Sequence, residues 1–334
     1  MHPKIALVNK MDINFTRSKK DNDFDMSENN FSLLSGLATE KRNAASENID
    51  ELSTIDVVRL INDEDKKVAD AITPILPNIA KAVDIIAAGI ASGGRLIYCG
   101  AGTSGRLGVL DAAECPPTFG VSQGLVTGII AGGRAAMFEA QEGAEDSPEL
   151  GATDLKKLSL TEKDIVVGIA ASGRTPYVIG ALSYARSLKS KTIAVSCSPD
   201  SPISRIADIA LTAVTGPEII TGSTRMKAGT AEKMILNMLS TGTMIKLGKT
   251  YGNLMVDLKA TNKKLVARAK NIVMSATGCT MDESIDALAK SNGSAKKAIF
   301  IILTGTDADK AAYWLSEAKG HLGLALKLYN HSTK

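Results

Sequence analysis

Residues 95–108 read RLIYCGAGTSGRLG, a short apolar run followed by a glycine-rich loop. Residues 164–177 repeat this arrangement as DIVVGIAASGRTPY, and both loops contain the tripeptide Ser-Gly-Arg. A short, nearly continuous apolar run is typical of a strand buried on both faces of a sheet. The two segments therefore predict two similar strand–loop–helix units in an α/β protein.

Three further apolar runs, at residues 125–131, 191–197 and 209–214, are separated from these by helical stretches. Strands that alternate with helices predict βαβ units and a doubly wound parallel sheet. Ligands of such sheets bind beyond the carboxyl ends of the strands. We therefore expect the functional residues in the loops that follow the strands.

The segments outside the sheet are expected to be helical or irregular. Residues 1–38 form a polar extension without apolar periodicity, and residues 39–85 carry helical patterns. Long helices are expected at residues 228–248 and 257–277. Three short helical patterns after residue 280 predict a small helical bundle.

The composition excludes several classes of function. The 334 residues carry a net charge of +3 with both signs interspersed, whereas a nucleic-acid-binding surface needs a basic stripe. The sequence predicts no membrane span and no secretory signal, because its apolar runs are too short. The four cysteines form no C-x-x-C pair and the three histidines lie near the termini, which predicts reduced thiols and no metal site. We expect a cytoplasmic protein.

The segment Gly100-Ala-Gly-Thr-Ser-Gly105 matches the dinucleotide-binding pattern G-x-G-x-x-G. That interpretation also requires an acidic residue at the end of the next strand, and none occurs between Cys115 and Phe138. The loop is therefore predicted to bind an anion, without a nucleotide cofactor, through backbone N–H groups at a helix N-terminus. Thr103 and Ser104 add hydroxyl donors.

A third loop rich in hydroxyl groups, TGSTRMKAGT at residues 221–230, precedes the long helix. Three such loops on one sheet favour a shared site for a sugar phosphate. Two simpler interpretations stay open: the serines and threonines can be helix N-caps, and the charges of the third loop can be solvated. The candidate ligands of the phosphosugar are Gly102, Thr103, Ser104, Gly105, Arg106, Ser172, Gly173, Arg174, Thr175, Ser223, Thr224 and Lys227.

Two sets of carboxylates are candidates for acid–base chemistry. Glu114 lies in LDAAECPP, and a helix that ends before Pro116 would place it in the last turn, where it opposes the helix dipole. A residue that breaks a local rule is a functional candidate. Spacing alone does not select a member of the second set, which consists of Glu139, Glu142, Glu145 and Asp146.

Together these segments resemble the N-acetylmuramic acid 6-phosphate etherases. The resemblance covers about residues 39–323 and is carried chiefly by GAGTSGRLGVLDAAECPPT, which begins at Gly100, and by GAEDS at 143–147. It implies a sugar isomerase (SIS) domain, a doubly wound parallel sheet, over residues 86–249. It also implies a homodimer and a helical C-terminal region, residues 250–334, with a bundle like a ubiquitin-associated domain.

The resemblance also implies a reaction, in the recycling of peptidoglycan amino sugars. Enzymes of this family cleave the lactyl ether of N-acetylmuramic acid 6-phosphate with water, by elimination and then hydration, to give N-acetylglucosamine 6-phosphate and D-lactate. The family's two glutamates match Glu114 as the acid, which burial would help to keep protonated, and Glu145 as the base, without a metal. Two alternatives are an aldose–ketose isomerase, which needs no acid for a leaving group at carbon 3, and a sugar-phosphate-sensing regulatory protein. The presence of both glutamates favours the etherase.

Overall fold

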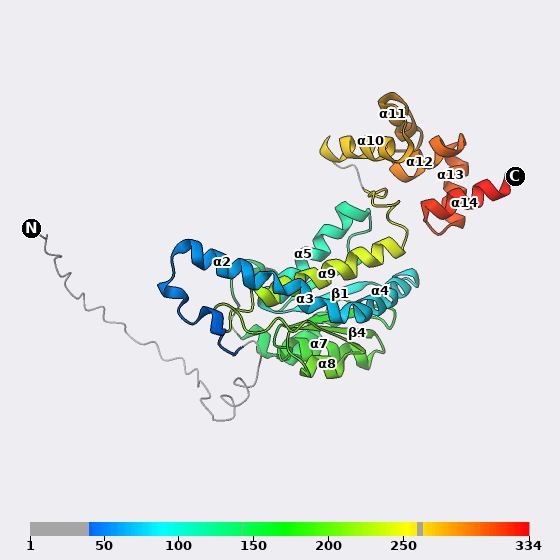
Figure 1. Ribbon diagram of the computed structural model, residues 1–334. Helices are drawn as coiled ribbons and strands as arrows, with labels where there is room; N and C mark the ends of the chain where they lie inside the picture. The colour runs from blue at the N-terminus through cyan, green and yellow to red at the C-terminus, as the bar shows by residue number, and fades with distance from the viewer. Residues whose placement is uncertain (1–39, 142, 259–262, 334) are drawn as a thin grey trace, which may run out of the picture. The chain divides into compact units, whose positions relative to one another are not determined.

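The computed structural model describes residues 40–141, 143–258 and 263–333. The polar extension predicted for residues 1–38 lies outside the described residues. From Glu40 onward the chain forms helices up to Ala91, then strands of a central sheet alternate with helices up to Thr212, and further helices follow (Figure 1).

Five parallel strands form the sheet, in the order β2-β1-β3-β4-β5. They are β1 (Leu96–Gly100), β2 (Val126–Ile130), β3 (Ile165–Ile169), β4 (Lys191–Ser196) and β5 (Ile209–Thr212). Each lies within a predicted apolar run, so the predicted parallel sheet is confirmed. The chain moves from β1 to β2 on one side and returns to β3 on the other side of β1. The carboxyl ends of β1 and β3 therefore flank a topological switch point, where ligands of such sheets bind.

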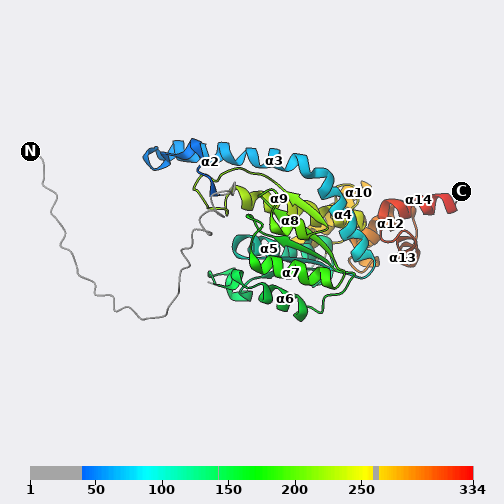
Figure 2. The same cartoon turned by 90° about the horizontal axis from the view of Figure 1, so that it is seen from below.

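Helices cover both faces of the sheet. One face packs against α4 (Leu76–Ala91), α5 (Gly102–Phe119) and α9 (Lys227–Lys246), and the other against α6 (Pro148–Lys157), α7 (Pro176–Ser187) and α8 (Pro202–Ile206). Figure 2 shows α6 and α7 together on their side of the molecule. This double covering explains why the strands are nearly continuous apolar runs.

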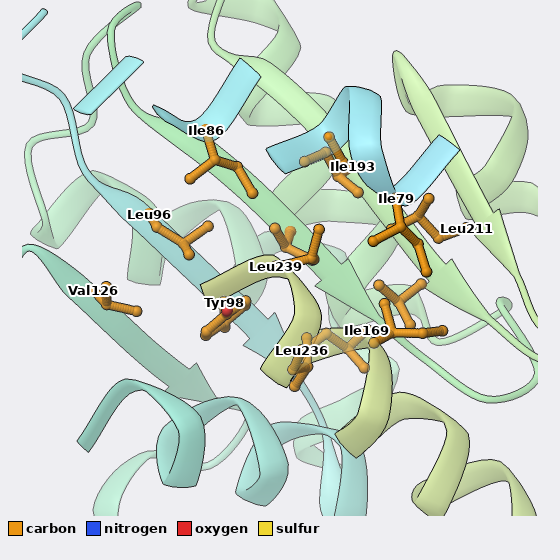
Figure 3. Close-up of a cluster of buried hydrophobic side chains, with 14 of the residues drawn as sticks. Ile79, Ile86, Leu96, Tyr98, Val126, Ile169, Ile193, Leu211, Leu236 and Leu239 are labelled. Carbon is orange, nitrogen blue, oxygen red and sulfur yellow. The ribbon is translucent and has the colours of Figure 1, made fainter. Parts of the chain in front are cut away.

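The side chains of β1 alternate between the two cores. Leu96 and Tyr98 pack with Ile86 of α4 and Leu239 of α9, as Figure 3 shows, whereas Ile97 packs on the opposite face. Ile86, Leu96, Ile97, Tyr98 and Leu239 are all fully buried. Burial of one large apolar side chain stabilises a fold by about 1.5–3 kcal/mol. The sheet is thereby a rigid platform for the loops at its carboxyl edge.

Helix α5 does not end where the sequence predicts. It continues through Pro116 and Pro117 to Phe119, and Gly120 closes it in the left-handed conformation with its N–H on the Pro116 carbonyl. The two prolines remove only hydrogen bonds of the final turns, and burial of Cys115 and Phe119 in the core holds those turns in place. Glu114 consequently lies inside the helix and not at its end.

The N-terminal helices are α2 (Thr54–Asp65), α3 (Lys67–Ile72) and α4. The run Thr54–Ala91 contains an 18-residue window of mean hydropathy 1.4 and is long and apolar enough, by length and composition only, to cross a membrane. Its last part, α4, buries Ile79 and Ile86 in the core of the sheet domain. A helix that covers a sheet can be as long and as apolar as a membrane-spanning helix. The apolar residues of α4 are therefore explained by its packing against the sheet.

The C-terminal helices are α10 (Lys263–Thr277), α11 (Met281–Lys290), α12 (Ala295–Thr304), α13 (Ala308–Glu317) and α14 (Leu322–Ser332). They share a core of their own that includes Val273, Phe300 and Leu315. The three short helices predicted after residue 280 are confirmed as α11 to α13, and α14 was not predicted. Thr280 begins α11 with a capping box, a sequence signature of a helix start.

Candidate functional site

A pocket of about 400 Å³ opens beyond the carboxyl ends of β1 and β3. It lies at the switch point of the sheet, where the loops after these two strands meet. Loops after β1, β2 and β3 and the loop before α9 all contribute to its wall. The lining residues are Glu40, Ala101, Gly102, Thr103, Ser104, Glu145, Asp146, Ala170, Ala171, Ser172, Arg174, Thr175, Pro176, Gly222 and Thr224.

The loop after β1 brings the N-terminus of α5 to this pocket. A Cβ atom on Gly105 would lie 2.7 Å from the Gly100 carbonyl oxygen and 2.6 Å from the Ile130 side chain, so only glycine lets the helix start this close to the sheet. Gly102 has a φ of +50°, in the left-handed region that favours glycine. The first N–H groups of α5 are therefore held at the floor of the pocket, where they favour an anion.

The N-cap interpretation of the serines and threonines is wrong for the loop before α5 and holds only by position for the loop before α7. Ala101 is the N-cap of α5, and Thr175 is the N-cap of α7 but its side chain makes no capping hydrogen bond. The Ser172 hydroxyl accepts a 3.3 Å hydrogen bond from the Arg174 N–H within its loop. Thr103, Thr175 and Ser172 thus line the pocket with hydroxyl groups that do not cap a helix.

Ser104 lies at the back of the pocket and is bonded to a residue that sequence reasoning missed. Its Oγ lies 2.9 Å from each carboxyl oxygen of Glu232, which projects from α9 and is only 1% exposed. Burial raises the pKa of Glu232 to about 8, although the hydrogen bond from Ser104 opposes this shift. The helical periodicity of Ala228, Ala231 and Ile235 would have predicted that Glu232 faces the core.

The third loop contributes only part of the predicted set. Gly222 and Thr224 line the pocket, but Lys227 is buried and its Nζ lies 2.5 Å from Glu64 Oε2. The side chains of this ion pair are 3% and 6% exposed. Glu218 accepts hydrogen bonds from the backbone N–H groups of Lys227 and Ala228, which satisfies the start of α9. The Lys227 ammonium group therefore forms an ion pair with Glu64, and neither residue is among the lining residues of the pocket.

Two members of the acidic cluster, Glu145 and Asp146, lie in the pocket wall. Both carboxylates are exposed on a 3-10 turn, Ala144–Asp146, after the left-handed residue Gly143. Glu145 also lines an adjoining cavity of about 220 Å³ together with Arg106, whose Nε donates to the Met137 carbonyl. Glu142 lies outside the described residues.

Glu114 is not brought to the pocket within one chain. It lies twelve residues after Gly102 on α5, which at 1.5 Å per residue is about 18 Å along the helix axis. Its side chain is exposed in the single chain, so the expected burial is not provided by this chain's own residues. Leu110, Ala113 and Pro117 are exposed on the same helix face, and Leu110 is 52% exposed.

Among the residues that the structure describes, no group of three His, Cys, Asp or Glu side chains is placed to hold a metal ion. The pocket instead combines backbone N–H groups, hydroxyls, the exposed Arg174 guanidinium and carboxylates. This donor set suits a small anionic ligand with hydroxyl groups and offers a base at its rim.

Comparison with known proteins identifies the family. Residues 137–242 match the SIS domain, and residues 78–186 match the glucokinase regulatory protein N-terminal SIS domain. The chain is 57% identical over 294 residues to a curated N-acetylmuramic acid 6-phosphate etherase of Clostridium beijerinckii, covering 88% of the chain and 97% of that relative. The chain belongs to the N-acetylmuramic acid 6-phosphate etherase family. The resemblance predicted from its motifs is thereby confirmed.

Other members of this etherase family are equally similar. Identity is 59% over 294 residues to the curated etherase of Clostridium botulinum (strain Okra), again with 88% of the chain and 97% of the relative covered. Identity is 57% over 293 residues to the curated etherase of Aliivibrio fischeri (strain MJ11), with 88% of the chain and 98% of the relative covered.

A solved structure of a phosphoheptose isomerase from Neisseria gonorrhoeae is also similar. The two sequences are 16% identical, the match covers 57% of this chain and 98% of the isomerase, and the TM-score is 0.45.

Proposed function

We propose that this protein cleaves the lactyl ether of N-acetylmuramic acid 6-phosphate with water, giving N-acetylglucosamine 6-phosphate and D-lactate in amino-sugar recycling. The observation that carries the proposal is a pocket of hydroxyls and helix N-termini with Glu145 at its rim, in a chain 57–59% identical to curated etherases. An aldose–ketose isomerase or a sugar-phosphate sensor would leave the second glutamate, Glu114, without a role.

The phosphate of the substrate is assigned to the floor of the pocket. The N-termini of α5 and α7 meet there, so their free N–H groups and positive dipole ends favour a phosphate. Thr103, Ser172 and Thr175 supply hydroxyl donors, and Arg174 supplies charge. The remaining wall, with Glu145 and Asp146, is left for the sugar.

Glu145 is proposed as the base. In the ring-opened sugar, the aldehyde at carbon 1 acidifies the proton at carbon 2, and a carboxylate within hydrogen-bond reach can remove it. The electron pair then forms the double bond between carbons 2 and 3, while the carbon–oxygen bond to lactate breaks and a general acid protonates the leaving oxygen. Addition of water to the unsaturated aldehyde restores a hydroxyl at carbon 3. These steps require one acid and one base, so we propose that no metal takes part.

Glu114 is proposed as that acid, supplied by a second copy of the chain. In one chain it lies about 18 Å from the start of α5, too far to reach a sugar bound there. It is surrounded by the exposed apolar residues Leu110, Ala113 and Pro117, a surface suited to burial against another protein. A two-fold symmetric dimer that covers this face places the same glutamate in both sites. It would also bury Glu114, as an acid that keeps its proton requires.

Mixing two inactive variants tests this arrangement. Glu114→Gln and Glu145→Gln should each lose about 10²–10⁴-fold in turnover, the usual contribution of a general acid or base. After the two are mixed and exchange subunits, a heterodimer contains one site with both glutamates intact, so about a quarter of wild-type activity should return. Absence of recovery after verified subunit exchange would show that both glutamates act from one chain.

We also propose that the enzyme works in the cytoplasm. Cys99, Cys115 and Cys197 are free, buried thiols. Reduced thiols of this kind are typical of a reducing compartment, which is also where phosphorylated sugars are metabolised.

A further inference from the structure

Glu232 is a buried carboxyl group that the proposed reaction does not use. It lies on α9, is 1% exposed, and accepts a hydrogen bond from Ser104, a lining residue of the pocket that is 8% exposed. Both of its oxygens lie 2.9 Å from the same hydroxyl. A carboxyl group without a cation is costly to bury, so its presence directly behind a hydroxyl of the phosphate pocket needs an explanation.

The ionisable groups near Glu232 are engaged elsewhere. Lys227, five residues earlier on α9, pairs with Glu64, and the next residue, Lys233, is exposed. On α5, Asp111 accepts hydrogen bonds from Tyr98, Asn237 and Ser240. The Cys197 thiol after β4 donates to the Ala228 carbonyl, and burial and the nearby Glu232 raise its pKa. Helices α3 and α4 contribute the apolar residues Val68, Ile72 and Ile79 to the core that they share with α9.

We propose that Glu232 is a positioning residue that sets whether the Ser104 hydroxyl donates its proton to the phosphate of the substrate. The proposal rests on the proposed function, because it assigns the phosphate to this pocket. Glu232 does not touch the substrate and acts through Ser104.

A serine hydroxyl has a single proton, so it can donate only one hydrogen bond at a time. If Glu232 is ionised, it can only accept, so the Ser104 proton points toward the carboxylate and lone pairs face the pocket. If Glu232 is protonated, its own O–H donates to Ser104 Oγ, and the Ser104 proton is free to donate to a phosphate oxygen. A negative charge behind the pocket would also repel a dianion in a region of low dielectric constant.

Protonation of Glu232 is therefore linked to phosphate binding. Burial raises the pKa of this carboxyl to about 8, so the form that favours binding prevails at neutral pH and is lost above it. The second pKa of a phosphate monoester is about 6, so the ligand itself stays dianionic over this range. If only the protonated form binds well, affinity should fall about tenfold between pH 7 and pH 9, because each pH unit above a pKa changes the neutral fraction about tenfold.

Titration calorimetry with N-acetylglucosamine 6-phosphate between pH 7 and pH 9 tests this inference. The wild type should lose affinity about tenfold, whereas Glu232→Gln, which cannot ionise, should bind with nearly constant affinity. Glu232→Met serves as a second variant of similar volume and should give the same flat profile. Lys233→Gln, at the neighbouring exposed position, should retain the pH dependence of the wild type.

The outcomes separate the two proposals. If the wild type binds and the same alkaline loss persists in Glu232→Gln and Glu232→Met, Glu232 is not the titrating group and the inference is overturned. If the wild type does not bind the phosphosugar at any pH, the proposed function fails and this inference fails with it. A purely structural role for Glu232 would lower the melting temperature of the variants but leave the pH profile unchanged.

Discussion

Replacement of Lys227 by methionine tests whether this lysine stabilises the fold or binds phosphate. Lys227→Met keeps most of the side-chain volume but removes the ammonium group from its pair with Glu64, whose side chain is 6% exposed. Glu64 would then keep its ion pair with Lys67, whose side chain is 64% exposed. The structure therefore predicts loss of stability, with little effect on the affinity for the phosphosugar.

The expected loss is about 3 kcal/mol in the free energy of unfolding. Removal of one partner of a buried ion pair typically costs about 3–5 kcal/mol, and the remaining Lys67 places this case at the lower end. The pKa of Glu64 leads to a similar figure: burial alone would raise it, but hydrogen bonds from Lys227 and Lys67 lower it from 4.5 to about 2. A shift of that size corresponds to about 3 kcal/mol for all the partners of Glu64 together, Lys67 included, and Lys227 is the largest contributor among them. Since the folded-state pKa is the lower one, this stabilisation is present above pH 4.5 and is lost as the pH falls toward 2.

Urea unfolding at pH 7, followed by far-ultraviolet circular dichroism, measures the loss. Lys246→Met is the matched control, because Lys246 pairs with Asp84 on the surface, where the side chains are 52% and 60% exposed. An exposed pair contributes about 0–1 kcal/mol. The double variant Lys227→Met/Glu64→Leu should recover stability, because it removes the unpaired charge. A Lys227→Met variant as stable as the control but impaired in phosphosugar binding would refute this account and restore Lys227 as a phosphate ligand.

Three further predictions concern the chemistry. Glu145→Gln should abolish solvent exchange of the carbon-2 proton, whereas Glu114→Gln should retain this exchange and lose lactate release. Proton NMR in deuterium oxide measures the exchange, and equal exchange in both variants would overturn the assignment of base and acid. Ser172→Ala should lower kcat/KM about ten- to hundredfold on the phosphorylated sugar, because one charge-assisted hydrogen bond contributes about 1.5–3 kcal/mol. The same variant should lose little activity on N-acetylmuramic acid, which has no phosphate. Equal losses on both substrates would show that Ser172 does not bind the phosphate. Treatment with EDTA should leave turnover unchanged, and activity that is lost and then restored by a divalent cation would contradict metal-independent catalysis.

Most of the sheet could be predicted from the sequence, because buried parallel strands are short apolar runs that end in glycine-rich loops. The same runs located Thr103 and Ser172 at one edge of the sheet, and the pocket lies there. The end of α5 was predicted wrongly, since the rule that proline stops a helix ignores the burial of Cys115 and Phe119 in the final turns.

The remaining errors concern partners that are distant in the sequence. Lys227 and Glu64 are 163 residues apart, and Ser104 and Glu232 are 128 apart. The local sequence pattern shows only that Lys227 lies in a polar loop and that Ser104 lies at the start of a helix. The packing of α9 against other helices determines which carboxylate each of these side chains contacts. The position of Glu114 is a similar case, because the partner proposed for its exposed helix face is a second chain.

Etherase activity is measured by incubating the purified protein with N-acetylmuramic acid 6-phosphate and following the release of D-lactate with a D-lactate dehydrogenase assay. We expect D-lactate and N-acetylglucosamine 6-phosphate in equal amounts, no more than about 1% of the wild-type rate from Glu145→Gln, and no dependence on added metal or nucleotide. Consumption of the sugar phosphate without lactate, or binding without any turnover by the wild type, would contradict the claim that this chain is an etherase.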